Sequence, residues 1–532
     1  MKKINWIDPK VPFGAKFALC AIIIFVFHAS VVNKYYHYLL PPEEAGQEQM
    51  YPVTLEDPIQ KWMDHLYGND AYQYINIGNN FSKGLGINVF CDWCEPPRYT
   101  PWNSWAPGAP IIFGTTFKIA RMLGFEKDMK SLYFMCWGMF FISSLIILGA
   151  LCVYTQNLWA MLLAAFVLGY SPPLQDWHYG KIFANSEVGI LVPLALSYLF
   201  YALGTKAFWK NQAITKRKLL YFALAGFFIG AASISRASNV SFAVVACLLF
   251  LGVVAIRLKF RFQPLLRAGI LCVAFYAAFQ VLPATTSLWN LARVGEYKIF
   301  DGTDWRIGIW QPYRGNGFTY SSGIGIGDYL NPEKADRLYN SSGLPRRTFS
   351  VEFLKEFAKQ PIKAAMFRIK RFPLLYLGYG GPAYPNNAMP PEKVWPEFSN
   401  IERMKGWIIG LYENQFYSVL MYLFLFMYLG SCIVRKTWPP EIMYFYLIFL
   451  LIASPFVHAE FRYSFPILLI IRMATPLAFL VLMAKLGLIH VPEPQFVACS
   501  DQDLQEADGI RINGIRKVLP QRLPKLLGFL HR

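Results

Sequence analysis

Asp70 is the acidic residue of this sequence with the best-defined local setting. The segment 68–81 repeats small and apolar residues at helical spacing, so we expect a helix there with one packed face. That face consists of Ala71, Tyr74, Gly78 and Phe81, and Gly84 and Gly86 follow as terminators. Asp70 falls in the first turn, where an acid commonly caps free amide groups. On spacing alone, capping is the simpler interpretation, and a chemical role for the carboxylate is the alternative.

Asp176 and His178 form a second group with chemical potential, in the segment 171–181. Together with Asp70 they could ligate a divalent metal ion, because carboxylate oxygens and imidazole nitrogens are common ligands. Two residues do not define a site, and a turn closed by an Asx hydrogen bond explains them more simply. We therefore predict no definite cofactor, and Asp176 stays a candidate second functional acid.

The segment 304–317 mixes cations, aromatic residues and glycines, among them Arg306, Trp310 and Arg314. Sugars stack on aromatic faces, and an Arg side chain can bind a phosphate through two parallel hydrogen bonds. These residues are therefore candidates for contacts with a donor or an acceptor. A basic loop lying on anionic lipid headgroups would have the same composition.

Cys91 and Cys94 are separated by two residues and lie in a long polar segment. In an oxidising compartment such a pair could close a small disulfide. No second cysteine pair accompanies them to complete a four-Cys zinc site. Most of the other cysteines fall in apolar stretches, where we expect small buried side chains.

The elements that position these residues are predicted to be membrane-spanning helices. Of the 532 residues 55% are hydrophobic and only 16% are charged, and the mean hydropathy is +0.31. These values exclude disorder, and a net charge of +18 in such an apolar chain does not indicate nucleic-acid binding. We predict an all-α polytopic membrane protein with about ten spans (about nine to twelve) and two large extracytoplasmic loops carrying short helices. The expected spans are 17–33, 131–154, 158–171, 187–205, 219–235, 238–256, 268–284, 407–434, 442–457 and 463–484.

The distribution of Lys and Arg predicts the orientation of these spans. Segments 1–16, 206–218, 257–267, 435–441 and 485–532 fall on one side if the spans alternate, and together they hold 22 basic and 7 acidic residues. The loop 34–108 falls on the other side, with four basic and nine acidic residues. Both termini are therefore expected in the cytoplasm, with 34–130 and 285–406 outside. The apolar stretch 110–123 carries Lys118 and Arg121, so we expect it to be interfacial or re-entrant.

An ordered set of short motifs resembles one enzyme family. Asp70-Ala71 is followed by Tyr72, Tyr74, Asn80 and two glycines, then by Arg98-Tyr99-Thr100-Pro101 and Pro107-Gly108-Ala109-Pro110. Ser186-Glu187 opens a span, Ser233-Ile234-Ser235-Arg236 ends a glycine-rich span, and Glu460-Phe461-Arg462-Tyr463 precedes Pro466 near the last span. The set resembles the GT-C superfamily of membrane glycosyltransferases, which includes the protein O-mannosyltransferases and the lipid A aminoarabinose transferases. It covers the first 285 residues in order and then the region near 460.

The resemblance implies a chemistry. GT-C enzymes pass a sugar from a polyprenyl-phosphate donor to an acceptor on the outer face, and their first-loop acid corresponds to Asp70. Many relatives carry Asp-Glu there, whereas here Asn69 and Ala71 flank a single carboxylate. A carboxylate can take the proton of an attacking hydroxyl, and fixed cations stabilise the phosphate that leaves. The candidate cations are Arg236, Arg462, His458, Arg98 and Lys181, although Arg236 could also only snorkel to water and Arg462 only pair with Glu460.

The predicted function is therefore inverting sugar transfer with Asp70 as general base. The chain divides into a GT-C-like module (1–285, with the catalytic loop 34–130), an outer loop region (286–406), further spans (407–484) and a cytoplasmic tail (485–532). Expected partners are the donor lipid and a glycan, lipid or protein acceptor, at a bacterial inner membrane with the active site on the periplasmic side. A flippase or transporter for a lipid-linked sugar is one alternative, and an O-antigen-type polymerase or ligase with Arg-rich outer loops is the other.

Overall fold

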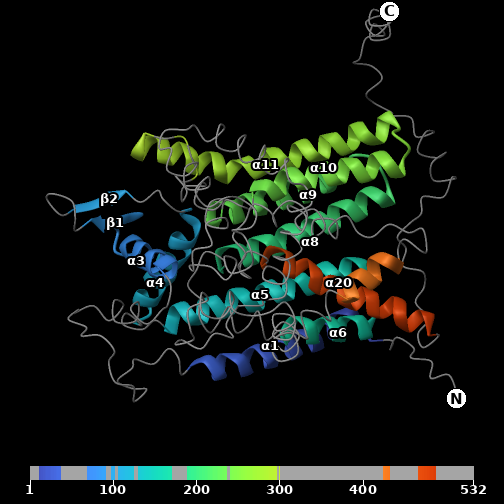
Figure 1. Cartoon of the computed structure of the whole chain (residues 1–532), viewed down its shortest axis with the longest axis horizontal. Helices are drawn as coiled ribbons and strands as arrows, with labels where there is room; N and C mark the ends of the chain where they lie inside the picture. The colour runs from blue at the N-terminus through green and yellow to red at the C-terminus, as the bar shows by residue number, and fades with distance from the viewer. Residues whose placement is uncertain are drawn as a thin grey trace, which may run out of the picture.

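The structure is a computed structural model, and it describes residues 11–36, 69–91, 98–101, 106–124, 130–170, 188–236, 240–295, 297, 299, 423–431 and 465–486. Long helices run side by side along the longest axis of the molecule, and a smaller group of elements lies across one end of them (Figure 1).

Eight helices make up the described part of the bundle. They are α1 (Phe13–Tyr36), α5 (Lys130–Tyr154), α6 (Leu158–Gly169), α8 (Val188–Lys210), α9 (Lys216–Ser235), α10 (Val240–Arg257), α11 (Phe262–Val294) and α20 (Phe465–Lys485). Helix α11 packs on α9, α9 on α8 and α8 on α5, while α6 lies against α1 and α20. A further short helical stretch covers 423–431.

Five of the described helices, α1, α5, α8, α9 and α11, are long and apolar enough to cross a membrane. Together with the composition they support an integral membrane protein, as the sequence predicts. Helix α6 is short, as expected for the stretch 158–171, and the apolar part of α10 is also shorter than a full span. Helix α11 extends to Val294, so the boundary predicted at residue 285 falls inside a helix. Of the later predicted segments, 442–457, 301–406 and the tail after 486 lie outside the described residues.

Glycines and small residues allow the helices of the bundle to approach closely. A Cβ placed on Gly226 of α9 would lie 1.9 Å from the carbonyl oxygen of Phe275 in α11, so only glycine fits there. Around this contact the core is filled by aromatic side chains, including Phe222, Phe250 and Phe275, which are almost fully buried. Close backbone approach through glycine is a common way for membrane helices to gain van der Waals contact.

The smaller group contains helix α3 (Asn69–Ser82), helix α4 (Gly108–Met122) and a two-stranded antiparallel sheet of β1 (Asn88–Cys91) and β2 (Arg98–Pro101). The pairing sets Asn88 opposite Pro101 and Cys91 opposite Arg98. The sheet differs from the all-helical expectation. Its strands carry β-branched and aromatic residues, which favour extended structure, but each is only four residues long and therefore gives a weak periodic signal.

Candidate functional site

Helix α3 carries Asp70 in its first turn, as the spacing predicts. Tyr74 is only 3% exposed and Gly78 is packed against α4, which confirms the predicted packed face at these positions. The helix ends at Ser82, and Gly84 and Gly86 follow with φ of 83° and 74°, a left-handed conformation that glycine adopts without strain. The local pattern therefore determines where this helix begins and ends.

A glycine-to-glycine contact joins α3 to α4. A Cβ on Gly78 would lie 2.9 Å from the Cβ of Phe113, and a Cβ on Gly114 would lie 2.5 Å from the carbonyl oxygen of Gly78. The guanidinium of Arg121, farther along α4, donates hydrogen bonds of 2.7 Å to Ser82 Oγ and to Asn79 Oδ1. The apolar stretch 110–123 is therefore a helix whose terminal arginine binds α3.

These contacts indicate the relative direction of the two helices. Gly78 meets the first half of α4, and Ser82, later in α3, meets the side chain of Arg121 at the end of α4. Asp70 precedes Gly78 by eight residues, which in an α-helix is about 12 Å. The backbone of Asp70 is therefore expected to lie toward the N-terminal end of α4, where Gly108 begins the helix.

That N-terminal end takes part in a tight junction of three helices. A Cβ on Gly108 of α4 would lie 2.3 Å from Ser235 Oγ and 2.8 Å from the carbonyl oxygen of Ile234. A Cβ on Gly189, in the first turn of α8, would lie 2.7 Å from the same Ser235 Oγ. The amide ends of α4 and α8 thus meet the carbonyl end of α9, an arrangement that the helix dipoles favour. We call these three residues, Gly108, Gly189 and Ser235, the glycine junction.

Arg236 follows the glycine junction directly and is the C-terminal cap residue of α9. Its backbone N–H donates a 2.9 Å hydrogen bond to the carbonyl oxygen of Ala232, and its backbone is extended, with φ −153° and ψ 112°. The residue is partly buried. The junction therefore fixes the backbone of a cation at the end of the bundle where α3 and α4 lie (Figure 1).

The C-terminal end of α11 is attached to the same region. Arg293 donates a 3.0 Å hydrogen bond from Nη1 to the carbonyl oxygen of Ile87, just before β1, and its guanidinium lies 4.0 Å from the ring centre of Trp289. Asn80 of α3 donates a 2.9 Å bond from Nδ2 to the carbonyl oxygen of Asn88. Helix α3 and the small sheet are thus tied both to each other and to the bundle.

Several predicted site residues lie outside the described residues: Asp176, His178, Lys181, Arg306, Trp310, Arg314, His458, Arg462 and Cys94. Arg98 begins β2, opposite Cys91. Within the part of the chain that the structure describes, no group of three potential metal ligands comes together. The structure therefore packs α3, which carries Asp70, on α4 and joins the start of α4 at Gly108 to the end of α9 beside Arg236; the roles of all the candidate residues stay predictions.

Sequence reasoning missed one buried cation. Arg472 of α20 is 1% exposed, and its guanidinium lies 5.6 Å from the ring centre of Phe140 in α5. The same ring stacks on His28 of α1, with the ring centres 4.8 Å apart. An arginine within the apolar span 463–484 was the available signal, because charged side chains inside spans are costly and commonly functional.

No family model matches the sequence, and no match was found among curated proteins. Among solved structures, the chain is similar to the oligosaccharyltransferase of Archaeoglobus fulgidus. The apo form matches with a TM-score of 0.47 and 14% identity over 94% of this chain and 52% of that one. The form tethered to an acceptor peptide containing an NVT sequon matches with a TM-score of 0.47 and 14% identity, over 93% of this chain and 55% of that one. The complex with zinc and sulfate matches with a TM-score of 0.47 and 13% identity, over 90% of this chain and 53% of that one. This chain thus spans about half the length of the protein it resembles.

Proposed function

We propose that this chain is an integral membrane glycosyltransferase of the GT-C type. The observation that supports this most directly is the junction of motifs that lie far apart in the sequence. The motif Pro107–Pro110, the start of α8 just after Ser186-Glu187, and the motif Ser233–Arg236 meet at one point, and α3 packs on the helix that begins there. These are the segments on which the family resemblance rests.

In the proposed reaction, the hydroxyl oxygen of an acceptor attacks the anomeric carbon of a sugar carried by a polyprenyl phosphate. The Asp70 carboxylate takes the proton of that hydroxyl as the new carbon–oxygen bond forms. The bond between the anomeric carbon and the phosphate oxygen breaks, and polyprenyl phosphate leaves with its electron pair. Attack opposite the leaving group inverts the anomeric configuration.

Arg236 is proposed to stabilise the negative charge that develops on the departing phosphate. A cation whose backbone is already fixed by helix packing needs little reorganisation as the charge grows, and this preorganisation is the main source of electrostatic catalysis. Arg98, Lys181, His458 and Arg462 are proposed as further donor contacts, and Arg306, Trp310 and Arg314 as contacts to donor or acceptor. A glycan, lipid or protein acceptor would approach from the face that carries α3 and α4, proposed to be periplasmic.

The test replaces Asp70 with Asn in cells that carry only the variant gene, followed by mass spectrometry of the envelope glycans. Asn has nearly the same size and shape as Asp, so the substitution removes the base and otherwise costs the first turn of α3 only one negative charge, worth about 0.3 to 1 kcal/mol at the start of a helix. We expect a loss of product of about 100- to 10,000-fold at normal protein level. Normal glycosylation by Asp70→Asn would refute the catalytic role.

Asn69→Ala is the matched control at the neighbouring position of the same helix. It should leave product formation nearly unchanged, because it alters the first turn of α3 without removing a carboxylate. Equal losses in the Asn69 and Asp70 variants at normal protein level would instead indicate that the start of α3 matters as structure and would contradict the assignment of a base.

A further inference from the structure

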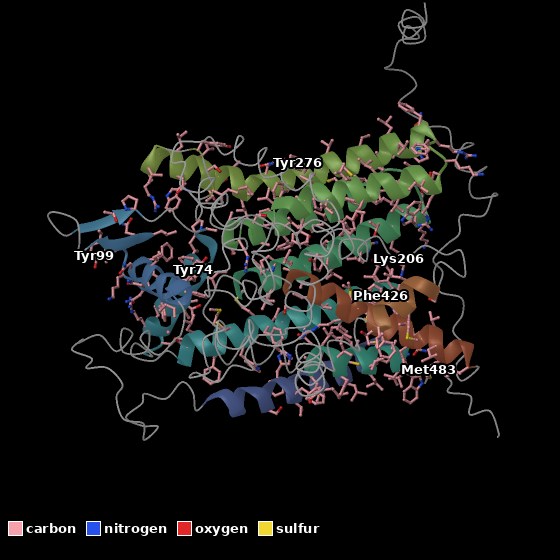
Figure 2. The ribbon with its side chains drawn as sticks, viewed as in Figure 1. Tyr74, Tyr99, Lys206, Tyr276, Phe426 and Met483 are labelled. Carbon is pink, nitrogen blue, oxygen red and sulfur yellow. The ribbon has the colours of Figure 1, made fainter. Side chains whose placement is uncertain are left out.

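A cavity lies at the opposite end of the bundle from α3 and α4. Its volume is about 520 Å³, and it opens between the N-terminal end of α1, the C-terminal ends of α5 and α8, and the N-terminal end of α9. Figure 2 shows Lys206, one of its residues, at the end of the bundle remote from Tyr74 of α3. The volume lies within the range of small-molecule sites, which is about 300 to 1,000 Å³.

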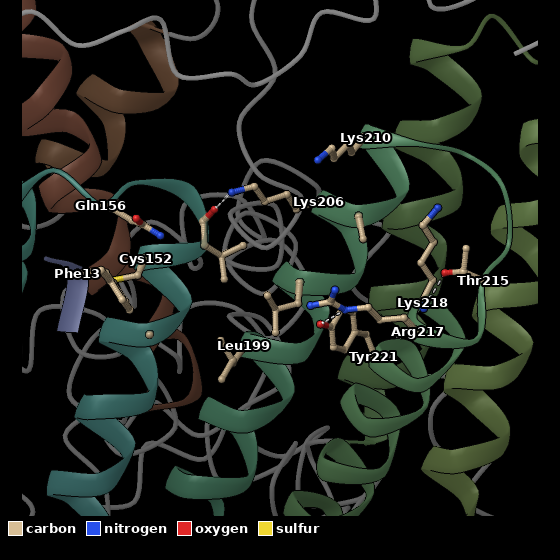
Figure 3. Close-up of a pocket in the computed structure, with 14 residues that line it drawn as sticks. Phe13, Cys152, Gln156, Leu199, Lys206, Lys210, Thr215, Arg217, Lys218 and Tyr221 are labelled. Atoms are coloured by element: carbon tan, nitrogen blue, oxygen red, sulfur yellow. Dashed lines mark hydrogen bonds between the residues drawn. The ribbon is translucent and has the colours of Figure 1, made fainter. Parts of the chain in front are cut away.

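The cavity combines apolar walls with a cationic rim. The walls are formed by apolar side chains, including Phe13 of α1, Val153 of α5, and Leu199 and Leu203 of α8. The rim carries Lys206, Lys210, Arg217 and Lys218, and none of the described residues that line the cavity is acidic (Figure 3). A soluble anion would be bound by the rim alone, whereas a lipid would also use the walls.

Hydrogen bonds hold part of this rim in place. Lys218 is 5% exposed, and its ammonium group donates hydrogen bonds to the carbonyl oxygens of Asn211 and Ala213, the latter at 2.6 Å. These bonds stabilise the loop between α8 and α9. Arg217 donates from Nε to the Tyr221 hydroxyl at 2.6 Å, and its guanidinium lies 5.4 Å from the centre of that ring. These bonds orient the guanidinium without using its two terminal nitrogens, which are the donors suited to phosphate.

Lys206 and Lys210 stand one helical turn apart near the end of α8, and both are exposed. Lys206 donates a hydrogen bond to the carbonyl oxygen of Val153, near the end of α5, where a cation also interacts favourably with the helix dipole. In Figure 3 Lys206 extends from α8 toward α5, and the guanidinium of Arg217 lies above Leu199. An apolar chain along the walls would therefore end with its headgroup at the rim.

We propose that this cavity binds an anionic glycerophospholipid, with the phosphate on Lys206, Lys210 and Arg217 and an acyl chain along the apolar walls. Basic pockets between spans bind lipid headgroups through this combination of charge and apolar contact. The site is separate from the proposed catalytic region and does not depend on glycosyl transfer. It belongs to the face that the Lys/Arg distribution predicts to be cytoplasmic, where anionic headgroups attract such clusters.

The experiment measures lipid binding to the purified full-length protein by native mass spectrometry, with phosphatidylglycerol and phosphatidylcholine as probes. Wild type should retain phosphatidylglycerol preferentially. The triple variant K206Q/K210Q/R217Q should bind phosphatidylglycerol at least tenfold more weakly, since each basic residue near an anionic headgroup contributes a factor of about five. Its binding of phosphatidylcholine should change less than twofold.

The control variant K216Q/K259Q/R261Q removes the same number of positive charges from exposed residues at the same end of the bundle, outside the cavity lining. It should bind phosphatidylglycerol within about twofold of wild type. Equal weakening in both triple variants would overturn the proposal in favour of general surface attraction. If the triple variant K206Q/K210Q/R217Q does not fold, the single variant R217Q is measured instead. It should bind phosphatidylglycerol about fivefold more weakly than wild type, and R217K should restore the binding.

Glycerol 3-phosphate distinguishes a lipid from a soluble phosphate ester, because it has the headgroup phosphate but no acyl chain. It should bind far more weakly than phosphatidylglycerol, since it makes no contact with the apolar walls. If it binds as tightly and competes with the lipid, the cavity is a site for soluble phosphate esters and the lipid assignment is wrong.

Discussion

The two ends of the helix bundle use different chemistry to hold their helices together. At the end with α3 and α4, helices meet through glycines. Gly78 packs against Gly114, while Gly108 and Gly189 both pack against Ser235. At the other end, the helices separate around a cavity rimmed by lysine and arginine. Close packing of glycines against neighbouring backbone leaves little room for movement, whereas the exposed side chains of Lys206 and Lys210 can adjust to what they bind. The first end is therefore suited to positioning reacting groups and the second to holding a charged headgroup.

The largest effect beyond that of Asp70 is expected at Arg236. Arg236→Gln should lower sugar transfer about 100- to 1,000-fold, because a preorganised donor to a developing oxyanion contributes this much. Arg236→Lys should lower sugar transfer less than Arg236→Gln, because lysine keeps the positive charge but lacks the planar guanidinium that binds phosphate through two hydrogen bonds. Envelope glycans measured by mass spectrometry report both. Arg217→Gln removes a cation at the opposite end of the bundle. If it lowered sugar transfer as much as Arg236→Gln does, the two ends would not differ in function as proposed.

A smaller loss of transfer is expected from Gly108→Ala. The new Cβ would lie 2.3 Å from Ser235 Oγ, so α4 must shift, and overpacking of this kind costs about 1 to 3 kcal/mol. A displacement of about 1 Å near reacting groups can lower the rate about 100-fold. Adding Ser235→Gly should restore part of the activity, although the Ile234 carbonyl oxygen still lies 2.8 Å away. Gly138→Ala in α5, where a Cβ has nothing within 4 Å, is the control and should have wild-type activity.

The smallest effect is expected from Arg121→Ala, which removes two hydrogen bonds between α4 and α3. These bonds are partly buried and involve a charged donor, so their loss should cost about 1 to 3 kcal/mol. Hydrogen exchange of the α3 amides should accelerate about 5- to 150-fold, while that of the α9 amides should not change. Arg217→Ala, which loses a bond to a tyrosine hydroxyl at the other end, should leave α3 exchange unchanged. Faster exchange throughout the molecule in either variant would contradict separate stabilisation of the two ends.

Much of the fold could be predicted because membrane helices give a strong local signal. The spans corresponding to α1, α5, α8, α9 and α11 follow from runs of apolar residues, and α3 follows from its spacing and its terminal glycines. The small sheet could not be predicted, since four-residue strands carry little periodicity. The position of Arg472 within an apolar span was visible in the sequence, but its contact with Phe140 could not be predicted, because it depends on which face α20 presents to α5.

The sequence by itself determined that the chain is apolar, which stretches form most of its described helices, and which face of the membrane its basic loops are predicted to occupy. These properties depend on neighbouring residues, on composition and on the cost of burying charge in a bilayer. Only the tertiary structure decided that Gly108, Gly189 and Ser235 meet, that Arg236 follows directly on this junction, and that the basic segment 206–218 faces a cavity. Such contacts join residues more than forty positions apart, and they depend on the shapes of whole helix faces, which no local pattern specifies.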